Sequence, residues 1–549
     1  MKPGTTGIRL AALAFAIAFV ALIANGRAIG SGDTNVVEKT AATLAQHGSL
    51  ILPEGEPLDP FTRPAVGGRV SIYPALSALM AAPFFWVFSL FFDLNPTGIQ
   101  VAGKLTAALF SSVAIAIMAT TFQRRTSAAR ALASALTFGV GTSLFSTAQA
   151  LWQHPAVLVF LSIALAALDA TESPGDATRL RSSSIAALSL ALTAACRPAC
   201  IPMCAILFLY LIHRRRPQAA LLITIALLPA MAVGFYNQMF FGAPWRFGQS
   251  VGGRFFGSFP ESIVGLLISP GRGLLVFTPI ALLAGWALIR AARSASMARG
   301  LSAAALAHFL FISSWNEWHG GESFGPRLLT DMLPLLFFFL PEALDAWPKI
   351  GAALAVVSVG VQLIGGWTYD YRWERLHQRG RVFDAALWSW TDSPLAFALR
   401  EGVVLQGIPD VEARRVRLRV RRFVPFGPQG SIIEAMEGGI RTTGAALFRD
   451  LRMERAARVS SGRILLQHPA DALAFRALSS GRFDLRLIGM LHGTARVETA
   501  ESVDTVVADG DFDSTLSVTL NAGDDVFIRS AAGELRLARV ELRTAPETQ

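Results

Sequence analysis

An arginine that follows a glycine-rich loop is the first residue in this sequence whose setting suggests chemistry. Arg327 ends the stretch HGGESFGPR and opens an apolar run. A glycine-flexed loop that enters a helix lets backbone N–H groups and a guanidinium converge on one anion. The pattern therefore predicts an anion-binding arginine. The alternative is an i,i+4 ion pair with Asp331, which would make the same charge structural.

Acidic and aromatic residues cluster near the ends of other apolar runs. Asp33 stands just beyond the first run, in SGDTNVVEKTAATLAQHGSLIL, where it could act chemically, cap a helix or mark the end of a span. His154, His319 and Glu322 lie on turns beside tryptophans. These side chains could line a substrate site, although tryptophan also marks the membrane interface in proteins of every function.

No metal ion or organic cofactor is predicted from these residues. His319 and its acidic neighbours match no metal-ligand spacing. Cys196, Cys200 and Cys204 recur every four residues, which predicts one helix face and small buried side chains rather than ligands.

The composition places most of the chain in a bilayer. Of the 549 residues, 52% are hydrophobic and only 16% are charged, which is too much apolar surface for an ordinary soluble core. The net charge of +10 would suggest nucleic acid in a soluble protein, but here much of the arginine lies in short clusters between apolar runs. That is the positive-inside pattern, so no nucleic-acid partner is predicted.

Eleven apolar runs are long enough to be predicted as spans. The run after the basic N-terminus is long for a signal peptide, so we expect it to remain as the first span. A twelfth run, 73–93, is predicted to lie in the outer interface, because only then do the arginine clusters face the cytoplasm. This puts the N-terminus in the cytoplasm and the C-terminus outside a cytoplasmic membrane. The predicted spans are 8–25, 98–122, 131–151, 155–170, 183–196, 199–212, 218–236, 273–290, 300–315, 328–346 and 350–367.

The predicted fold is a polytopic α-helical membrane domain over residues 1–367 followed by an extracytoplasmic domain over 368–549. The membrane domain has a first outer loop at 26–72. Charged residues and period-two patterns such as RVRLRVRRFV predict a β-rich domain, sandwich-like from about residue 410. The arginine-rich segment 414–422 is predicted to face anionic headgroups or glycans, or to be a solvated edge strand.

Four loop motifs occur in an order that resembles the GT-C class of membrane glycosyltransferases. The class includes protein O-mannosyltransferases and aminoarabinose transferases, and the motifs are similar to its family 39-like, phospholipid-carrier-dependent members. The likeness covers about residues 26–345, and it implies a polyprenyl-phosphate sugar as donor and no metal. The motifs are GRVSIYPALSALMAAPFF, YNQMFFGAPWRFGQ, LLISPGRGLLVFTP and WNEWHGGESFGPRLL.

The resemblance assigns roles to particular residues. It makes Asp33 the general base on an acceptor hydroxyl, with inversion at the sugar carbon. Where aminoarabinose transferases have Lys-Pro-Pro, this chain has Ile72-Tyr73-Pro74, so Arg69 is the nearest cation and Tyr73 is expected to line the site.

A phosphate leaving group also needs cations near the outer headgroups. Besides Arg327, we expect Lys104, Arg197 and Arg272 to serve, or else to snorkel toward the lipid headgroups.

The resulting hypothesis is an inverting glycosyltransferase that acts on a lipid, glycan or protein acceptor outside the membrane, among membrane lipids. Two alternatives remain. A transporter or flippase of lipid-linked sugars predicts polar residues at mid-membrane in paired halves, which the mostly apolar runs do not show. A non-catalytic envelope assembly protein leaves the order of the loop motifs unexplained.

Overall fold

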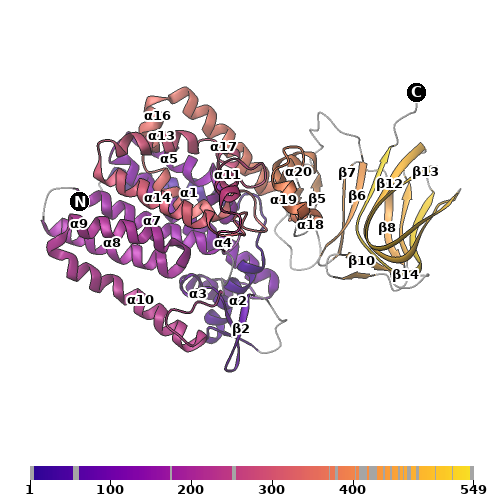
Figure 1. Cartoon of the computed structure of the whole chain (residues 1–549), viewed down its shortest axis with the longest axis horizontal. Helices are drawn as coiled ribbons and strands as arrows, with labels where there is room; N and C mark the ends of the chain where they lie inside the picture. Colours follow the sequence, from indigo (N-terminus) through magenta and orange to yellow (C-terminus); the bar gives the residue numbers. More distant parts are fainter. Residues whose placement is uncertain are drawn as a thin grey trace. The chain divides into compact units, whose positions relative to one another are not determined.

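The chain forms two compact units, Met1–Arg421 and Arg422–Gln549, which are described separately. The computed structural model (Figure 1) describes residues 5–53, 61–172, 176–249, 255–369, 371–377, 381–401, 404–406, 417–419, 430–436, 439–444, 448–454, 458–460, 463–466, 472–477, 481–500, 502–521 and 524–544. The expected arrangement of a helical membrane domain followed by a β-rich domain is confirmed. The division lies after residue 421 rather than after 367, because three short helices within residues 372–401 belong to the first unit.

Helices make up most of the first unit. Their bounds are α1 Thr5–Ile23, α2 Gly32–His47, α3 Leu76–Ser89, α4 Pro96–Gln123, α5 Ala128–Val140, α6 Ser143–Thr147, α7 Gln153–Ala170, α8 Asp176–Cys196, η1 Pro198–Cys200, α9 Ile201–Arg214, η2 Arg216–Gln218, α10 Ala219–Phe241, α11 Phe259–Ile268, α12 Leu274–Phe277, α13 Ala281–Ala292, α14 Ser296–Ser313, η3 Arg327–Met332, α15 Leu333–Leu336, α16 Leu340–Ala346, α17 Pro348–Thr368, α18 Arg372–His377, α19 Arg381–Leu387 and α20 Pro394–Glu401.

Among the described residues, six helices are long and apolar enough to cross a membrane: α1, α4, α7, α10, α14 and α17. Helix α10 needs lipid around it. It packs chiefly on α8 and leaves large apolar side chains such as Leu228, Met231 and Phe235 exposed. A helix that is apolar all round needs an apolar solvent. In Figure 1 it runs along the edge of the helical unit. The chain is a multi-pass membrane protein.

The other five expected spans do not form single long apolar helices. The run 131–151 breaks near Gly141 into α5 and α6, and 273–290 breaks at Pro279 into α12 and α13. The run 328–346 becomes η3, α15 and α16, with Pro334 and Pro341 in the first turns of the last two. Proline cannot donate a backbone hydrogen bond, so the breaks in the last two runs are local consequences of the sequence.

The remaining two expected spans flank Pro198. Helix α8 begins with turns that hold Arg179 and Arg181, and helix α9 has 14 residues. The break at Pro198 also corrects the expected cysteine face, because Cys196 ends α8, Cys200 lies in η1 and Cys204 lies in α9. All three thiols are buried and free, as small core side chains would be.

The segment between α1 and α4 forms a small layer of its own. Helix α2 packs on α3 and on a three-stranded sheet of β1 Ile51–Leu52, β2 Thr62–Ala65 and β3 Gly68–Ser71 (Figure 1). Glu38 ties α2 to the membrane helices, because its Oε1 accepts the Leu151 N–H at 3.0 Å beside Gly103 of α4. Burial raises the pKa of Glu38 to about 8, so its neutral form is favoured there.

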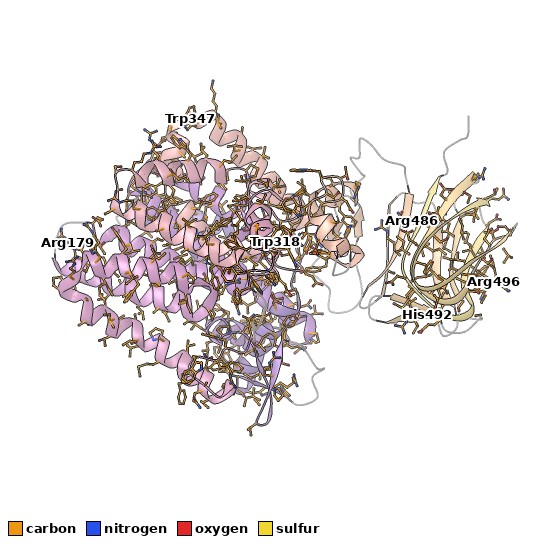
Figure 2. All side chains as sticks on the ribbon, in the orientation of Figure 1. Arg179, Trp318, Trp347, Arg486, His492 and Arg496 are labelled. Carbon is orange, nitrogen blue, oxygen red and sulfur yellow. The ribbon has the colours of Figure 1, made fainter. Side chains whose placement is uncertain are left out.

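Tryptophans mark both the interior and the edge of the helical unit. Trp318 lies within it in Figure 2 and is almost fully buried, whereas Trp347 lies at its periphery and is exposed. The motif that contains Trp318 is therefore part of the packed interior rather than a surface belt.

The second unit is β-rich. Its described strands form one nine-stranded sheet in which β14 Asp525–Thr544 pairs with β12 Gly481–Glu498 along one edge. The other edge of β14 pairs in turn with β11 Ala472–Ala477, β10 Arg463–Leu466 and β6 Gly430–Met436. The remaining strands of this sheet are β7 Gly439–Gly444, β8 Phe448–Glu454, β9 Arg458–Ser460 and β13 Val503–Leu520.

This continuous sheet replaces the expected two-sheet sandwich. Alternate residues of β12, such as Phe483, Leu485 and Leu487, are buried in one core, as the period-two pattern predicted. Pairing between β12 and β14 shifts register at Ile488/Gly489 and at Thr494/Ala495, and such bulges bend and twist a sheet. Most of the arginine-rich segment 414–422 lies outside the described residues. Its residues 417–419 form β5, which pairs with β4 Val404–Gln406.

We predict that residue 129, at the exposed start of α5, faces the cytoplasm. Ala129→Cys should stay unlabelled by a membrane-impermeant maleimide on intact cells and become labelled after permeabilisation. Val66→Cys, at a site 95% exposed in the hairpin of the first outer loop, should be labelled from outside. The buried native cysteines should give little background. Labelling of Ala129→Cys from outside would contradict the predicted orientation.

Candidate functional site

An ion pair joins the two residues that the sequence singled out most strongly. Arg327 Nη1 lies 2.9 Å from Asp33 Oδ2. Asp33 does not cap α2, because the Ser31 N–H donates to Thr34 Oγ1 at 3.0 Å and these two residues close the helix start. The carboxylate of Asp33 is therefore available to face the loop that carries Arg327.

The glycine-rich loop sets the direction of Arg327. Gly320, Gly321 and Gly325 have φ angles of +74°, +65° and +84°, values that side chains with a Cβ rarely adopt. Arg327 Nη2 donates to the Gly320 carbonyl at 2.6 Å, and its guanidinium lies 4.0 Å from the centre of the Trp152 ring. Three different contacts thus hold one guanidinium in place.

Asp331 does not pair with Arg327, contrary to one alternative reading of the sequence. Residues Arg327–Met332 form a 3-10 helix, so positions four apart do not stack. Asp331 instead lies 2.7 Å from His154 Nδ1 and 3.0 Å from Arg197 Nε. Arg197 Nη1 also lies 2.9 Å from His154 Nε2. A neutral His154 satisfies both contacts by donating from Nδ1 and accepting at Nε2.

Asp33, Arg197 and Arg327 line a cavity with about 600 Å³ of empty space, here called the polar cavity. Asp33, Tyr73, Trp152, Arg197, Gln249 and Arg327 are among its lining residues. The side chains of Asp33, Arg197 and Arg327 are 28%, 13% and 11% exposed, so each can reach a ligand while remaining held. Four expected site residues therefore meet at one place: Asp33, Tyr73, Arg197 and Arg327.

Tyr73 lies against the carboxylate. Both residues line the polar cavity, and burial together with the nearby Asp33 charge holds the pKa of Tyr73 above its usual range. The phenol therefore stays neutral beside the carboxylate.

A second cavity, here called the apolar cavity, adjoins the first. It has about 680 Å³ of empty space and is lined mainly by α3, α8 and α10, with Leu79, Leu192, Val233 and Phe247 among its residues. Chain neighbours connect the two: Ile72 and Gly248 line the apolar cavity, and the next residues, Tyr73 and Gln249, line the polar cavity. An apolar chamber thus opens beside a charged one.

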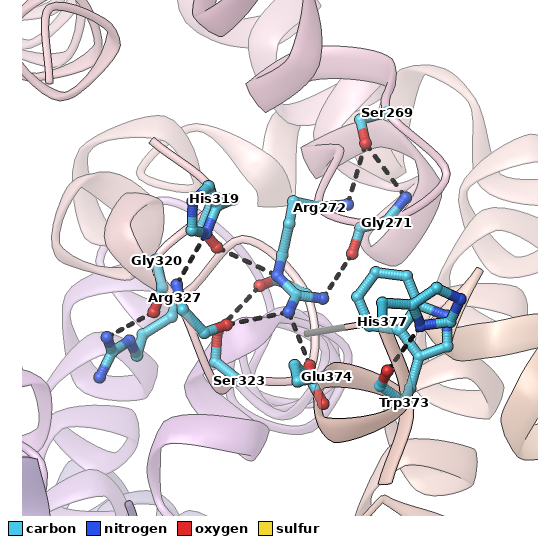
Figure 3. Close-up of polar contacts among 12 residues, drawn as sticks. Ser269, Gly271, Arg272, His319, Gly320, Ser323, Arg327, Trp373, Glu374 and His377 are labelled. Atoms are coloured by element: carbon cyan, nitrogen blue, oxygen red, sulfur yellow. Dashed lines mark hydrogen bonds and ion pairs between the residues drawn. The ribbon is translucent and has the colours of Figure 1, made fainter. Parts of the chain in front are cut away.

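Arg272 is fully buried and does not line the polar cavity. Figure 3 shows that it grips the glycine-rich loop from the side opposite Arg327. It donates to the carbonyls of His319 at 3.0 Å and Gly321 at 2.9 Å, while Nη2 lies 2.6 Å from Glu374 Oε1. Arg327 binds the carbonyl of Gly320, which lies between His319 and Gly321 in the sequence. The structure therefore gives Arg272 a positioning role rather than the expected contact with a donor phosphate.

Lys104 and Arg69 also lie apart from the polar cavity. Lys104 is buried in α4, where its Nζ donates to Gln149 Oε1 and lies 3.4 Å from Asn25 Oδ1. Arg69 stays within the hairpin of the first outer loop, where its Nε donates to Thr62 Oγ1 at 2.6 Å. Neither cation is among those that the fold brings to Asp33.

The other expected lining residues take different places. His154 is fully buried and supports Arg197 from behind. The ring of His319 packs edge-on against Phe383, with centres 4.9 Å apart, and accepts the Gly321 N–H at Nδ1. Glu322 lines a third, smaller cavity on the other side of Arg327. Among the described residues, no group of three or more His, Cys, Asp or Glu is placed to hold a metal ion.

No protein-family model and no curated protein matches this chain. Similar solved structures include ArnT from Cupriavidus metallidurans bound to undecaprenyl phosphate, at 16% identity and a TM-score of 0.45, covering 69% of this chain and 67% of ArnT. ArnT in the apo state has 18% identity and a TM-score of 0.43, covering 68% of this chain and 69% of ArnT. The arabinosyltransferase EmbB from Mycobacterium smegmatis has 12% identity and a TM-score of 0.32, covering 98% of this chain and 64% of EmbB.

ArnT and EmbB are GT-C membrane glycosyltransferases, the class whose loop motifs this sequence resembles.

Sequence reasoning missed several residues that complete the site. The tryptophan beside His154 was expected to lie near a sugar or to mark the membrane interface, yet the ring of this residue, Trp152, packs against the Arg327 guanidinium. Glu374 and its neighbours Tyr369 and Tyr371 fall in YDYRWE, directly after the last expected span. The density of aromatic and charged residues in that short segment was a usable signal, since an ordinary exposed linker rarely carries so many.

We predict that Glu374 keeps the glycine-rich loop ordered. Glu374→Gln removes the only carboxylate that pairs with Arg272 among the described residues, and breaking a buried pair typically costs about 3–5 kcal/mol. Amide hydrogen exchange over residues 319–325 should accelerate by at least about tenfold, since each factor of ten needs only about 1.4 kcal/mol.

The matched control is Glu541→Gln in the second unit, where Glu541 lies 2.7 Å from Arg539 in another buried pair. That variant should leave exchange over 319–325 unchanged. Wild-type exchange rates in Glu374→Gln would contradict the positioning role.

Proposed function

We propose that this protein is an inverting glycosyltransferase that moves a sugar from a polyprenyl-phosphate donor to a lipid, glycan or protein acceptor outside the cytoplasmic membrane. The observation that carries the proposal is the polar cavity, where the Asp33 carboxylate meets Arg327 and Arg197 beside an apolar chamber. A base and two cations in one cavity suit a substitution whose leaving group is a phosphate.

The reaction needs one proton acceptor and one anion site. The acceptor oxygen attacks the sugar carbon that bears the phosphate, and Asp33 takes the hydroxyl proton. The bond between that carbon and the phosphate oxygen breaks, and its electron pair leaves with the polyprenyl phosphate. Attack opposite the leaving group inverts the configuration in a single step. Arg327 and Arg197 neutralise the charge that develops on the departing phosphate.

The apolar cavity supports a lipid-linked donor. A sugar nucleotide or free sugar phosphate has no long apolar part to fill a chamber lined by Leu79, Leu192, Val233 and Phe247. A polyprenyl chain does, and burying each CH₂ contributes about 0.8 kcal/mol. The donor would then lie with its chain in the apolar cavity and its phosphate in the polar one.

The ion pair between Asp33 and Arg327 is consistent with a site that binds an anionic substrate. While they pair, the Asp33 carboxylate lies beside a cation, and the Tyr73 hydroxyl lines the same cavity. A donor phosphate would compete with Asp33 for the guanidinium and leave the carboxylate free to accept a proton. The Trp152 ring and the Gly320 carbonyl keep Arg327 in place during that exchange.

Removing the base should abolish transfer. We predict that Asp33→Asn lowers the rate of sugar transfer by about 10²–10⁴-fold, the usual contribution of a general base. The assay supplies membranes that contain the protein with a set of labelled polyprenyl-phosphate sugars. Asp93→Asn, an exposed carboxylate after α3, is the matched control and should transfer at the wild-type rate. Full transfer by Asp33→Asn would remove Asp33 from this role.

Removing the cation should weaken binding of the lipid phosphate. We predict that Arg327→Ala raises the Kd for undecaprenyl phosphate by at least about tenfold, since a hydrogen bond to a charged group is worth about 1.5–3 kcal/mol. Binding can be followed with protein in nanodiscs. Arg69→Ala is the control, because Arg69 lies in the hairpin and should leave the Kd unchanged. Equal affinities for wild type and Arg327→Ala would place the phosphate elsewhere.

A further inference from the structure

A third cavity lies on the other side of Arg327 and Trp152, the two residues that it shares with the polar cavity. We call it the tyrosine cavity, because Tyr369 and Tyr371 form part of its wall. It is a small cavity that is partly open to solvent, and its other lining residues include Gln149, Glu322 and Ser323. Both the glycine-rich loop and the segment after α17 contribute to it.

Tyr371 is held in an unusual conformation at this wall. Its φ angle is +65°, which is rare for a residue with a large side chain and costs on the order of 1–3 kcal/mol. Its ring packs edge-on against Tyr369, with centres 5.0 Å apart. The surrounding packing therefore imposes a conformation that aims this side chain, and such strain recurs at binding sites.

The hydroxyl of Tyr371 is buried and makes no hydrogen bond within the part of the chain that the structure describes. A buried hydroxyl without a partner costs about 1–3 kcal/mol, so native proteins rarely keep one without a use. Glu322, on the same wall, presents a carboxylate that accepts hydrogen bonds. The cavity thus offers a donor and acceptors that need a polar ligand.

We infer that the tyrosine cavity binds the sugar acceptor, as a hydroxylated carbohydrate ring. The partly exposed ring of Tyr371 gives flat apolar surface for the C–H face of a sugar, and Glu322 and the Tyr371 hydroxyl pair with its hydroxyls. This narrows the acceptor class from lipid, glycan or protein to a carbohydrate, and it rests on the proposed function.

Charge assigns the two substrates to different cavities. Glu322 is an anion and would repel the donor phosphate, whereas Arg197 lines only the polar cavity. Arg327 lies between them, 2.9 Å from the base Asp33. The chain also links the two cavities, because Ile29 lines the tyrosine cavity and Asp33, four residues on, lines the polar one. An acceptor ring that enters from this side meets the donor at the carboxylate.

The test measures how two variants depend on each substrate. Glu322→Gln and Tyr371→Phe are assayed with the labelled polyprenyl-phosphate sugar that the wild type uses, against increasing amounts of detergent-extracted envelope as acceptor. We expect the apparent KM for the acceptor extract to rise at least fivefold, while the KM for the donor and the Kd for undecaprenyl phosphate change less than twofold. Glu317→Gln, on the same loop but not lining the cavity, should match the wild type.

Stability separates this role from a structural one. The Tyr371 hydroxyl has no partner in the described structure, so Tyr371→Phe should melt at or above the wild-type temperature. An unchanged acceptor KM in both variants would overturn the inference, as would a rise confined to the donor KM, which would place the donor sugar in this cavity. A wild type that transfers no sugar at all would instead overturn the proposed function.

Discussion

The site depends on a single guanidinium held by three contacts from different parts of the chain. Arg327 pairs with Asp33 of the first outer loop, donates to Gly320 of its own loop and lies on the ring of Trp152 before α7. Because a guanidinium is planar and always charged, these contacts fix its orientation as well as its place. It forms part of the wall of both the polar and the tyrosine cavity, so a shift of Arg327 would change both.

The glycine-rich loop can hold Arg327 only because it is itself gripped from behind. Arg272 binds the carbonyls of His319 and Gly321, Arg327 binds that of Gly320, and Glu374 neutralises Arg272 (Figure 3). Gly320 and Gly321 both have left-handed backbone in this loop, which glycine adopts without the strain that a Cβ would add. The buried arginine therefore acts through the loop rather than on a ligand, and its carboxylate partner Glu374 comes from α18, which follows the last long apolar helix.

On the other wall of the polar cavity, buried residues likewise hold an arginine that faces the cavity. His154 and Asp331 are fully buried, and together they fix Arg197, which alone of the three lines the cavity. Each cation that faces the cavity is thus backed by a buried polar partner. Pre-oriented charges need little rearrangement when charge develops on a leaving group, which is the main way that enzymes stabilise such transition states. The apolar cavity beside them lets the same site receive an amphiphilic molecule.

Local patterns in the sequence predicted the helical membrane domain, the β-rich end and the loops that carry chemistry. Run length, residue period and the neighbours of glycine and proline are properties of short segments, so they can be read without knowing the fold. Arg327 could be named in advance from its glycine-rich loop, whereas Asp33, Tyr73 and Arg197 were named with the help of the resemblance to the GT-C class. The predicted spans gave too little weight to proline and glycine within apolar runs. Several of them are therefore short or interrupted helices in the structure.

Only the tertiary structure decided which residues meet. Asp33 and Arg327 are 294 positions apart, and nothing local to either shows that they pair. For the same reason, the sequence did not show that Arg272 and Lys104 lie away from the polar cavity, or that Trp152 and Glu374 contribute to the site. A buried charge is satisfied by whichever segment packs against it. Sequence by itself determined which groups could do chemistry near the membrane surface; packing between distant segments determined which of them share a site, because ion pairs and cavities are properties of contacts in space.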